Sequence, residues 1–218
     1  GWGTLSVDPA FVSEFKSGDT RRSASIIDWE AEGITSLAAF GDTYRDQREY
    51  TGYTIKKYSP LCYADGTSAS KEDGSGDFQL SNHQDYVIMR YADVLLMAAE
   101  LGSPKAQEYF DEVRKRAYTS EGTLSANYSQ LPVTKENIMQ ERRLEFAFES
   151  INYWDLLRQG VDYAASKLAL SEKQVYSGGI VDFITISADR IRTTKGLSQI
   201  PYNQITLSNG TLVQNAGW

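Results

Sequence analysis

RYADVLLMAAEL, residues 90–101, is the stretch of sequence that decides the fold. Alanine, leucine, methionine and glutamate are strong helix formers, and Gly102 follows where helices commonly end. Apolar residues occupy most faces of the predicted helix, so neighbouring elements must cover it on several sides. The stretch therefore predicts a buried helix within a larger helical region.

A second helix follows almost at once, with Ser103 as its expected N-cap and Pro104 at its first position. Its apolar residues recur at helical spacing, at Ala106, Tyr109, Phe110, Val113 and Ala117. Because the connection is so short, we expect the two helices to form an antiparallel hairpin.

A second helical hairpin is expected further along the chain. Thr134 is a suitable N-cap for a helix that runs to about Glu149. Another helical piece covers Tyr153 to Gln159, and residues 161–170 continue it after a kink. The hairpins start about 45 residues apart, slightly more than the period of most helical repeats. The predicted fold is mainly α, with hairpins of tetratricopeptide type between about residues 90 and 170.

The flanking regions are predicted to be irregular, with short β elements. Residues 8–16 fit a helix capped by Asp8, while residues 22–29 and 53–58 are typical of short strands. The tail from Ile180 to Trp218 is expected to be β-like or extended. No linker is apparent, so a single domain is predicted over residues 1–218.

Composition excludes several classes of function. The chain carries 22 basic and 29 acidic residues, a net charge of -7, and lacks the basic face of a nucleic-acid-binding protein. It has one cysteine, Cys62, and one histidine, His83, too few for a zinc site built from Cys and His. His83 lies in a polar loop, which does not favour a Ser-His-Asp triad. We expect no metal, no cofactor, no catalytic residue and no transmembrane segment.

Four stretches, in this order, resemble the SusD/RagB family. They are residues 1–22 with Gly18-Asp19-Thr20-Arg21, residues 90–100, residues 138–160 (IMQERRLEFAFESINYWDLLRQG) and the ending QNAGW at residues 214–218. Ala216 stands where the family usually has proline, and Trp218 where tyrosine is common. Family members are roughly twice as long or more, so the resemblance implies that this chain is the C-terminal portion of one.

The resemblance implies a lipoprotein of the bacterial outer membrane, surface-exposed and anchored upstream of this segment. It implies non-catalytic capture of oligosaccharides and their delivery to a SusC-like TonB-dependent transporter. Two alternatives stay open: a helical-repeat module that binds peptides and imports another nutrient, and a glycoside hydrolase, which would use two carboxylates.

The charged and aromatic residues of the family motifs are interpreted as structural, because a partly buried arginine requires a carboxylate partner. Glu145 and Asp155 are the expected partners, and the ring of Trp154 is expected in the core. The residues predicted to be structural are Arg90, Glu141, Arg142, Arg143, Glu145, Trp154, Asp155 and Arg158.

Sugar-binding candidates are aromatic residues in predicted loops, because a tyrosine or tryptophan ring can stack on the C–H face of a pyranose. The candidates are Trp29, Tyr44, Tyr50, Tyr53 and Tyr63.

Overall fold

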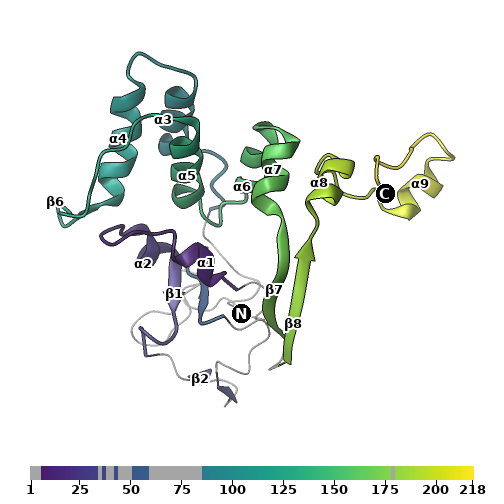
Figure 1. Ribbon diagram of the computed structural model, residues 1–218, viewed down its shortest axis with the longest axis horizontal. Coiled ribbons are helices and arrows are strands. Elements are labelled where there is room, and N and C mark those ends of the chain that lie inside the picture. The colour runs from purple at the N-terminus through teal and green to yellow at the C-terminus, as the bar shows by residue number, and fades with distance from the viewer. Residues whose placement is uncertain (1–5, 34–35, 38–41, 44–50, 59–84, 178–179) are drawn as a thin grey trace. The chain divides into compact units, whose positions relative to one another are not determined.

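The computed structural model describes residues 6–33, 36–37, 42–43, 51–58, 85–177 and 180–218 (Figure 1). The chain divides into two compact units. The first unit comprises Gly1–Glu149 and Tyr176–Ile180, and the second comprises Ser150–Val175 and Val181–Trp218. The single domain expected over residues 1–218 stays a prediction.

The predicted helical hairpin is confirmed in the first unit, where α3 (Tyr91–Glu100) packs against α4 (Ala106–Ala117). Leu96 and Phe110 have no exposed surface, which places the apolar stripes of both helices in the core. α4 begins later than expected, since the Ser103 hydroxyl accepts a hydrogen bond from the Lys105 N–H one turn before the helix.

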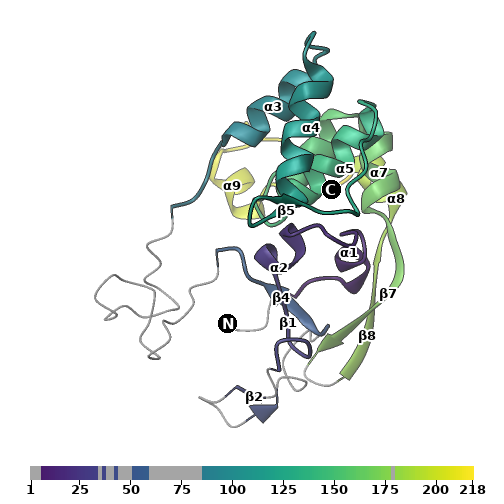
Figure 2. The ribbon, with the colours of Figure 1, turned by 90° about the vertical axis from the view of Figure 1, so that its left-hand side faces the viewer.

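The third helix, α5 (Lys135–Glu145), packs beside α3, as both ribbon views show (Figures 1 and 2). The side chain of Thr134 accepts a hydrogen bond from the Asn137 N–H, so its predicted role as N-cap is confirmed. The helix ends four residues before the expected Glu149. Phe148 and Ser150 have φ angles of 66° and 63°, a left-handed backbone that does not continue a helix.

The N-terminal part of the first unit combines two short helices with a pair of strands. Helix α1 (Pro9–Val12) is capped by Asp8 and is shorter than predicted, and α2 (Arg21–Ser25) leads directly into β1 (Ile26–Asp28). Strand β4 (Tyr53–Ile55) pairs antiparallel with β1, with Ile26 opposite Ile55. Four further short strands form two small antiparallel pairs. Strand β2 (Ser36–Leu37) pairs with β3 (Asp42–Thr43), and β5 (Thr119–Ser120) pairs with β6 (Thr123–Leu124).

A core cluster joins these N-terminal elements to the end of α5. It consists of Val7, Val12, Phe15, Ile26, Leu144 and Ala147. Because Leu144 and Ala147 come from the helical region, the early strands and helices share one core with it. This shared core fixes the position of the polar groups at the C-terminal end of α5.

The second unit contains α6 (Asn152–Arg158), α7 (Val161–Leu168) and most of the two paired strands β7 (Leu170–Ser177) and β8 (Ile180–Ile186), whose adjoining ends belong to the first unit. The strand predicted around Ile180 to Ile186 is confirmed. The rest of the tail is not extended as expected, because it forms α8 (Ala188–Thr194) and α9 (Tyr202–Leu207). Ser187 caps α8 by accepting a hydrogen bond from the Arg190 N–H. No helix in the described residues is long and apolar enough to cross a membrane.

Candidate functional site

Two of the predicted sugar-binding residues lie at the same end of the β1–β4 pair. Asp28 is opposite Tyr53, and the next residue, Trp29, donates its backbone N–H to the Gly52 carbonyl at 3.1 Å. Trp29 is half-buried, and Tyr53 packs partly against the core cluster. Tyr44, Tyr50 and Tyr63 lie outside the described residues.

A second aromatic pair was not predicted from the sequence. The rings of Tyr58 and Tyr86 have centroids 6.1 Å apart and planes inclined by 31°. Tyr86 is 62% exposed and its hydroxyl donates to the Glu149 carbonyl at 3.5 Å. The two tyrosines are far apart along the chain, and nothing in the local sequence of either indicates the pairing.

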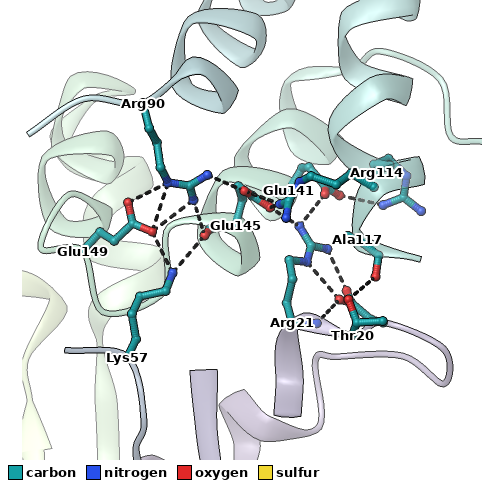
Figure 3. Close-up of polar contacts among 11 residues, drawn as sticks. Thr20, Arg21, Lys57, Arg90, Arg114, Ala117, Glu141, Glu145 and Glu149 are labelled. Atoms are coloured by element: carbon teal, nitrogen blue, oxygen red, sulfur yellow. Dashed lines mark hydrogen bonds and ion pairs between the residues drawn. The ribbon is translucent and has the colours of Figure 1, made fainter. Parts of the chain in front are cut away.

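Acidic and basic side chains from five segments of the first unit form one connected network, which we call the charge cluster. Figure 3 shows its hydrogen bonds and ion pairs. Its members are Asp19, Arg21, Lys57, Arg90, Arg114, Arg116, Glu141, Glu145 and Glu149.

Glu141 is the buried centre of the charge cluster, with 0% exposed surface. Its two carboxylate oxygens accept from Nη1 of Arg21 at 2.6 Å and Nη1 of Arg114 at 2.7 Å. Arg21 also donates Nε and Nη2 to Asp19, at 2.9 and 2.7 Å. Burial alone would lower the pKa of Arg21, but the hydrogen bond to Asp19 and the nearby carboxylates outweigh it and raise that pKa.

Glu145 lies one turn further along α5 and accepts from three arginines. Arg90 Nη1 donates at 2.5 Å, Arg116 Nη2 at 2.5 and 2.6 Å, and Arg21 Nη1 at 3.1 Å. Burial would raise the pKa of Glu145, but the charges of Arg116, Arg90 and Arg21 and the Arg90 hydrogen bond lower it below its usual value. Burial would lower the pKa of Arg90, but its hydrogen bonds to Glu149 and Glu145 and their negative charges outweigh burial and raise that pKa.

Glu149, just beyond α5, connects the charge cluster to the segments that carry the Tyr58–Tyr86 pair. Its carboxylate accepts from Lys57 Nζ at 2.7 Å and from Arg90 Nε at 3.0 and 3.2 Å. Lys57 immediately precedes Tyr58, and Arg90 lies four residues after Tyr86. One carboxylate therefore holds both segments.

Of the other motif arginines, Arg142 and Arg143 have partners that were not expected, while Arg158 pairs with the expected Asp155. Arg142 donates to Asp93 at 2.6 Å, and Arg143 donates to Glu14 at 2.9 and 3.0 Å. Asp155 accepts from Arg158 at 2.9 Å, within α6. The structural role predicted for these residues stays a prediction.

The expected burial of Trp154 is wrong, because the residue is 64% exposed. On α6 it is Asp155 and Leu156 that are buried, each 6% exposed. Residues two apart on a helix point in nearly opposite directions, so the burial of Leu156 turns Trp154 outward.

The charge cluster offers little for acid–base chemistry. Each of its carboxylates accepts from at least one arginine or lysine, an arrangement that favours the charged form and holds segments together. Within the described part of the chain, no group of three or more His, Cys, Asp or Glu side chains could hold a metal ion. Cys62 and His83 lie outside that part.

Sequence reasoning missed several members of the charge cluster. Asp19 and Arg21 belong to a stretch that carried the family resemblance, and a buried role could have been inferred from it. Lys57, Arg114 and Arg116 give no such signal, because each lies on a segment whose exposed face is expected to be charged.

The sequence that forms the helical hairpins and the charge cluster matches a known protein family. The sequence model that describes the SusD family matches residues 6–218 of this chain. This chain belongs to the SusD family. It is 26% identical over 170 residues to SusD-like protein P2 of Formosa agariphila, covering 72% of this chain and 32% of that protein.

Solved structures of SusD-like proteins match the fold along the entire chain. Surface glycan-binding protein A from Bacteroides thetaiotaomicron, in complex with laminarihexaose, has a TM-score of 0.72 and 28% identity, over 100% of this chain and 42% of that one. The protein of the same name from Bacteroides fluxus has a TM-score of 0.66 and 29% identity, over 100% and 41%. The chain thus spans about a third of the length of its first curated relative and about two-fifths of these structures. The mainly helical fold predicted from the sequence is confirmed.

Proposed function

We propose that this member of the SusD family captures oligosaccharides at the bacterial cell surface without changing them chemically. The observation that carries the proposal is the match, over the whole chain, to a surface glycan-binding protein in complex with laminarihexaose. The carboxylates of the charge cluster are engaged by arginine or lysine, so this cluster does not supply the free carboxylic acid that a glycosidase requires.

Capture is proposed to be weak and reversible. Sugar hydroxyls exchange water for protein partners with little net gain, and stacking on aromatic rings supplies much of the remainder. We expect dissociation constants in the micromolar to millimolar range, which correspond to about 4–8 kcal/mol. A protein that passes its cargo on must also release it.

The proposed partner is a SusC-like TonB-dependent transporter, to which the captured glycan is delivered. The proposed location is the outer surface of the outer membrane, through a lipid anchor upstream of this segment. No nucleic acid is expected to bind, in keeping with the net charge of -7.

Isothermal titration against a glycan panel that includes laminarihexaose tests the proposal. We expect saturable binding of at least one oligosaccharide and unchanged sugars after prolonged incubation. If the protein binds peptides but no glycan, the proposed nutrient class is wrong. Release of shorter sugars would indicate a hydrolase. Co-elution of the purified protein with a SusC-like transporter tests the proposed partner separately.

A further inference from the structure

The Tyr58–Tyr86 pair of the first unit places an exposed tyrosine ring beside a half-buried one. Tyr86 is 62% exposed, although a tyrosine ring normally gains free energy by burial. Tyr58 has a φ angle of 62°, a left-handed backbone that few residues other than glycine adopt. An exposed tyrosine ring held beside a half-buried one on an unfavourable backbone suits a ligand contact.

We propose that Tyr58 and Tyr86 form a stacking platform for a pyranose ring of the bound glycan. This inference rests on the proposed function and goes beyond it by assigning a site. The ring of a tyrosine offers an apolar face to the C–H groups of a sugar. Two rings inclined by 31° with centroids 6.1 Å apart present neighbouring contact surfaces of this kind.

The charge cluster fixes this platform in place. Glu149 accepts from Lys57 Nζ, next to Tyr58, and from Arg90, which follows Tyr86 in the chain. Lys57 and Arg90 also donate to the Glu145 carbonyl, at 3.4 and 2.7 Å, so both segments are attached to the end of α5. Preorganisation of this kind reduces the entropy lost when a ligand binds.

The polar surroundings of the rings favour a sugar over a peptide. Beside the rings lie the partly exposed side chains of Lys57 and Arg90, which keep 25% and 28% of their surface exposed. Extended peptides commonly bind to an open sheet edge or an apolar groove instead. Ile88, two residues after Tyr86, is 85% exposed. Its apolar side chain suits contact with a protein partner but cannot form hydrogen bonds with sugar hydroxyls.

Titration with laminarihexaose, or with whichever panel glycan binds best, tests the platform. We expect Tyr58→Ala and Tyr86→Ala each to raise the Kd by about three- to tenfold, the range expected for one aromatic contact. Tyr86→Phe keeps the ring and should stay within about twofold of the unmodified protein. Alanine at position 58 must adopt the same left-handed backbone as tyrosine, so this substitution adds little strain of its own.

Two control variants separate the platform from a general loss of apolar surface. Ile88→Ala removes a neighbouring exposed side chain, and Tyr202→Ala removes a tyrosine that is 80% exposed in the second unit. Neither should change the Kd. An equal loss with Ile88→Ala would overturn the inference and indicate a surface for a protein partner.

A labelling experiment on the unsubstituted protein does not depend on whether a variant folds. With 13C in the tyrosine rings, glycan addition should shift the signals of Tyr58 and Tyr86 and leave that of Tyr202 in place. Binding that leaves both ring signals and both alanine variants unchanged, yet is lost with Trp29→Ala, would overturn the platform while the proposed function stands. A protein that binds no glycan at all would instead refute the proposed function.

Discussion

Glu141 in the first unit lies between Arg21 and Arg114 with no exposed surface, whereas Asp162 and Asp189 of the second unit pair with Arg192 while 83% and 91% exposed. The distances are alike, at 2.6–2.7 Å in one and 2.8–2.9 Å in the other. Burial makes the difference. Removing one partner of a buried pair leaves the other charge buried with neither a partner nor water to stabilise it. Removing one partner of an exposed pair leaves a charge that water and salt ions stabilise.

The units also differ in how they distribute apolar surface. The first unit has an extended core that includes Leu96, Phe110 and Val113, each 1% exposed or less. The second unit buries fewer apolar residues among those described, namely Leu156, Ala164, Ala165 and Ile191, while both units leave large apolar side chains exposed. Substitutions are therefore expected to be costly at the centre of the first unit and mild at the surface of the second.

The largest effect is expected from Glu141→Gln. The change keeps the shape of the side chain but leaves Arg21 and Arg114 with less negative charge beside them. We expect the free energy of unfolding to fall by about 3–5 kcal/mol, the usual cost of breaking a buried ion pair. Urea denaturation measures this directly.

A tryptophan reporter assigns that loss to the first unit. Of the four tryptophans, Trp154 and Trp218 can be replaced by phenylalanine, which leaves Trp2 and Trp29, both before residue 149. In this background Glu108→Gln is the matched control, because its pair with Lys105 is about 60% exposed on both sides. A loss from Glu141→Gln no larger than that control would contradict the comparison of the units.

A pH dependence is expected from Glu145. Its pKa in the folded protein lies below the ordinary value of a glutamate, because Arg116, Arg90 and Arg21 together outweigh burial. A carboxylate with a lowered pKa contributes stability that is present above its unfolded pKa and lost as the pH falls through the folded value. The free energy of unfolding should therefore decrease as the pH drops below about 4.5.

Glu145→Gln provides the check, since glutamine does not titrate. The variant should be less stable at neutral pH and should lose less stability on acidification than the unmodified protein. If the curves of unfolding free energy against pH were parallel for the two proteins, other carboxylates would be responsible for the loss of stability at low pH.

The sequence predicted the helical hairpins because their signal is local. The stripe from Ala106 to Ala117 and the cap at Thr134 depend only on residues close to each other in the chain. The tail was harder to predict, since α8 and α9 have seven and six residues and too few turns to show an apolar stripe. Ser187 at the start of α8 was the one local cue.

The candidate site was largely beyond sequence reasoning, because its contacts join distant segments. Arg21 reaches Glu141 across 120 positions, and Arg90 reaches Glu149 across 59. The types of residue in the motifs suggested ion pairs, but the partner of each arginine depends on how the segments pack. For the same reason no local pattern links Tyr58 to Tyr86.

A smaller effect is expected from Trp154→Ala in the second unit. The ring is 64% exposed and contacts the Tyr153 ring edge to face, with centroids 5.4 Å apart. We expect a loss of about 1 kcal/mol or less, well below the cost of truncating a buried aromatic residue. Thermal unfolding checks this. A loss of about 3 kcal/mol or more would mean that the ring is buried in solution.

The smallest effect is expected from Arg192→Ala, which removes both exposed ion pairs of α8. Arg192 Nε donates to Asp162 on α7 at 2.8 Å, and its Nη1 donates to Asp189 at 2.9 Å, so the geometry matches that of the buried pairs. The carboxylates are open to water, however, and solvent replaces the lost hydrogen bonds at little cost.

We expect no measurable change in the thermal midpoint at physiological salt, and at most a slight decrease at low salt, where screening is weaker. Packing between α7 and α8 would still be provided by Ala164, Ala165 and Ile191, which are all buried. A salt-independent fall in the midpoint as large as that of Glu141→Gln would show that burial is not what separates the two units.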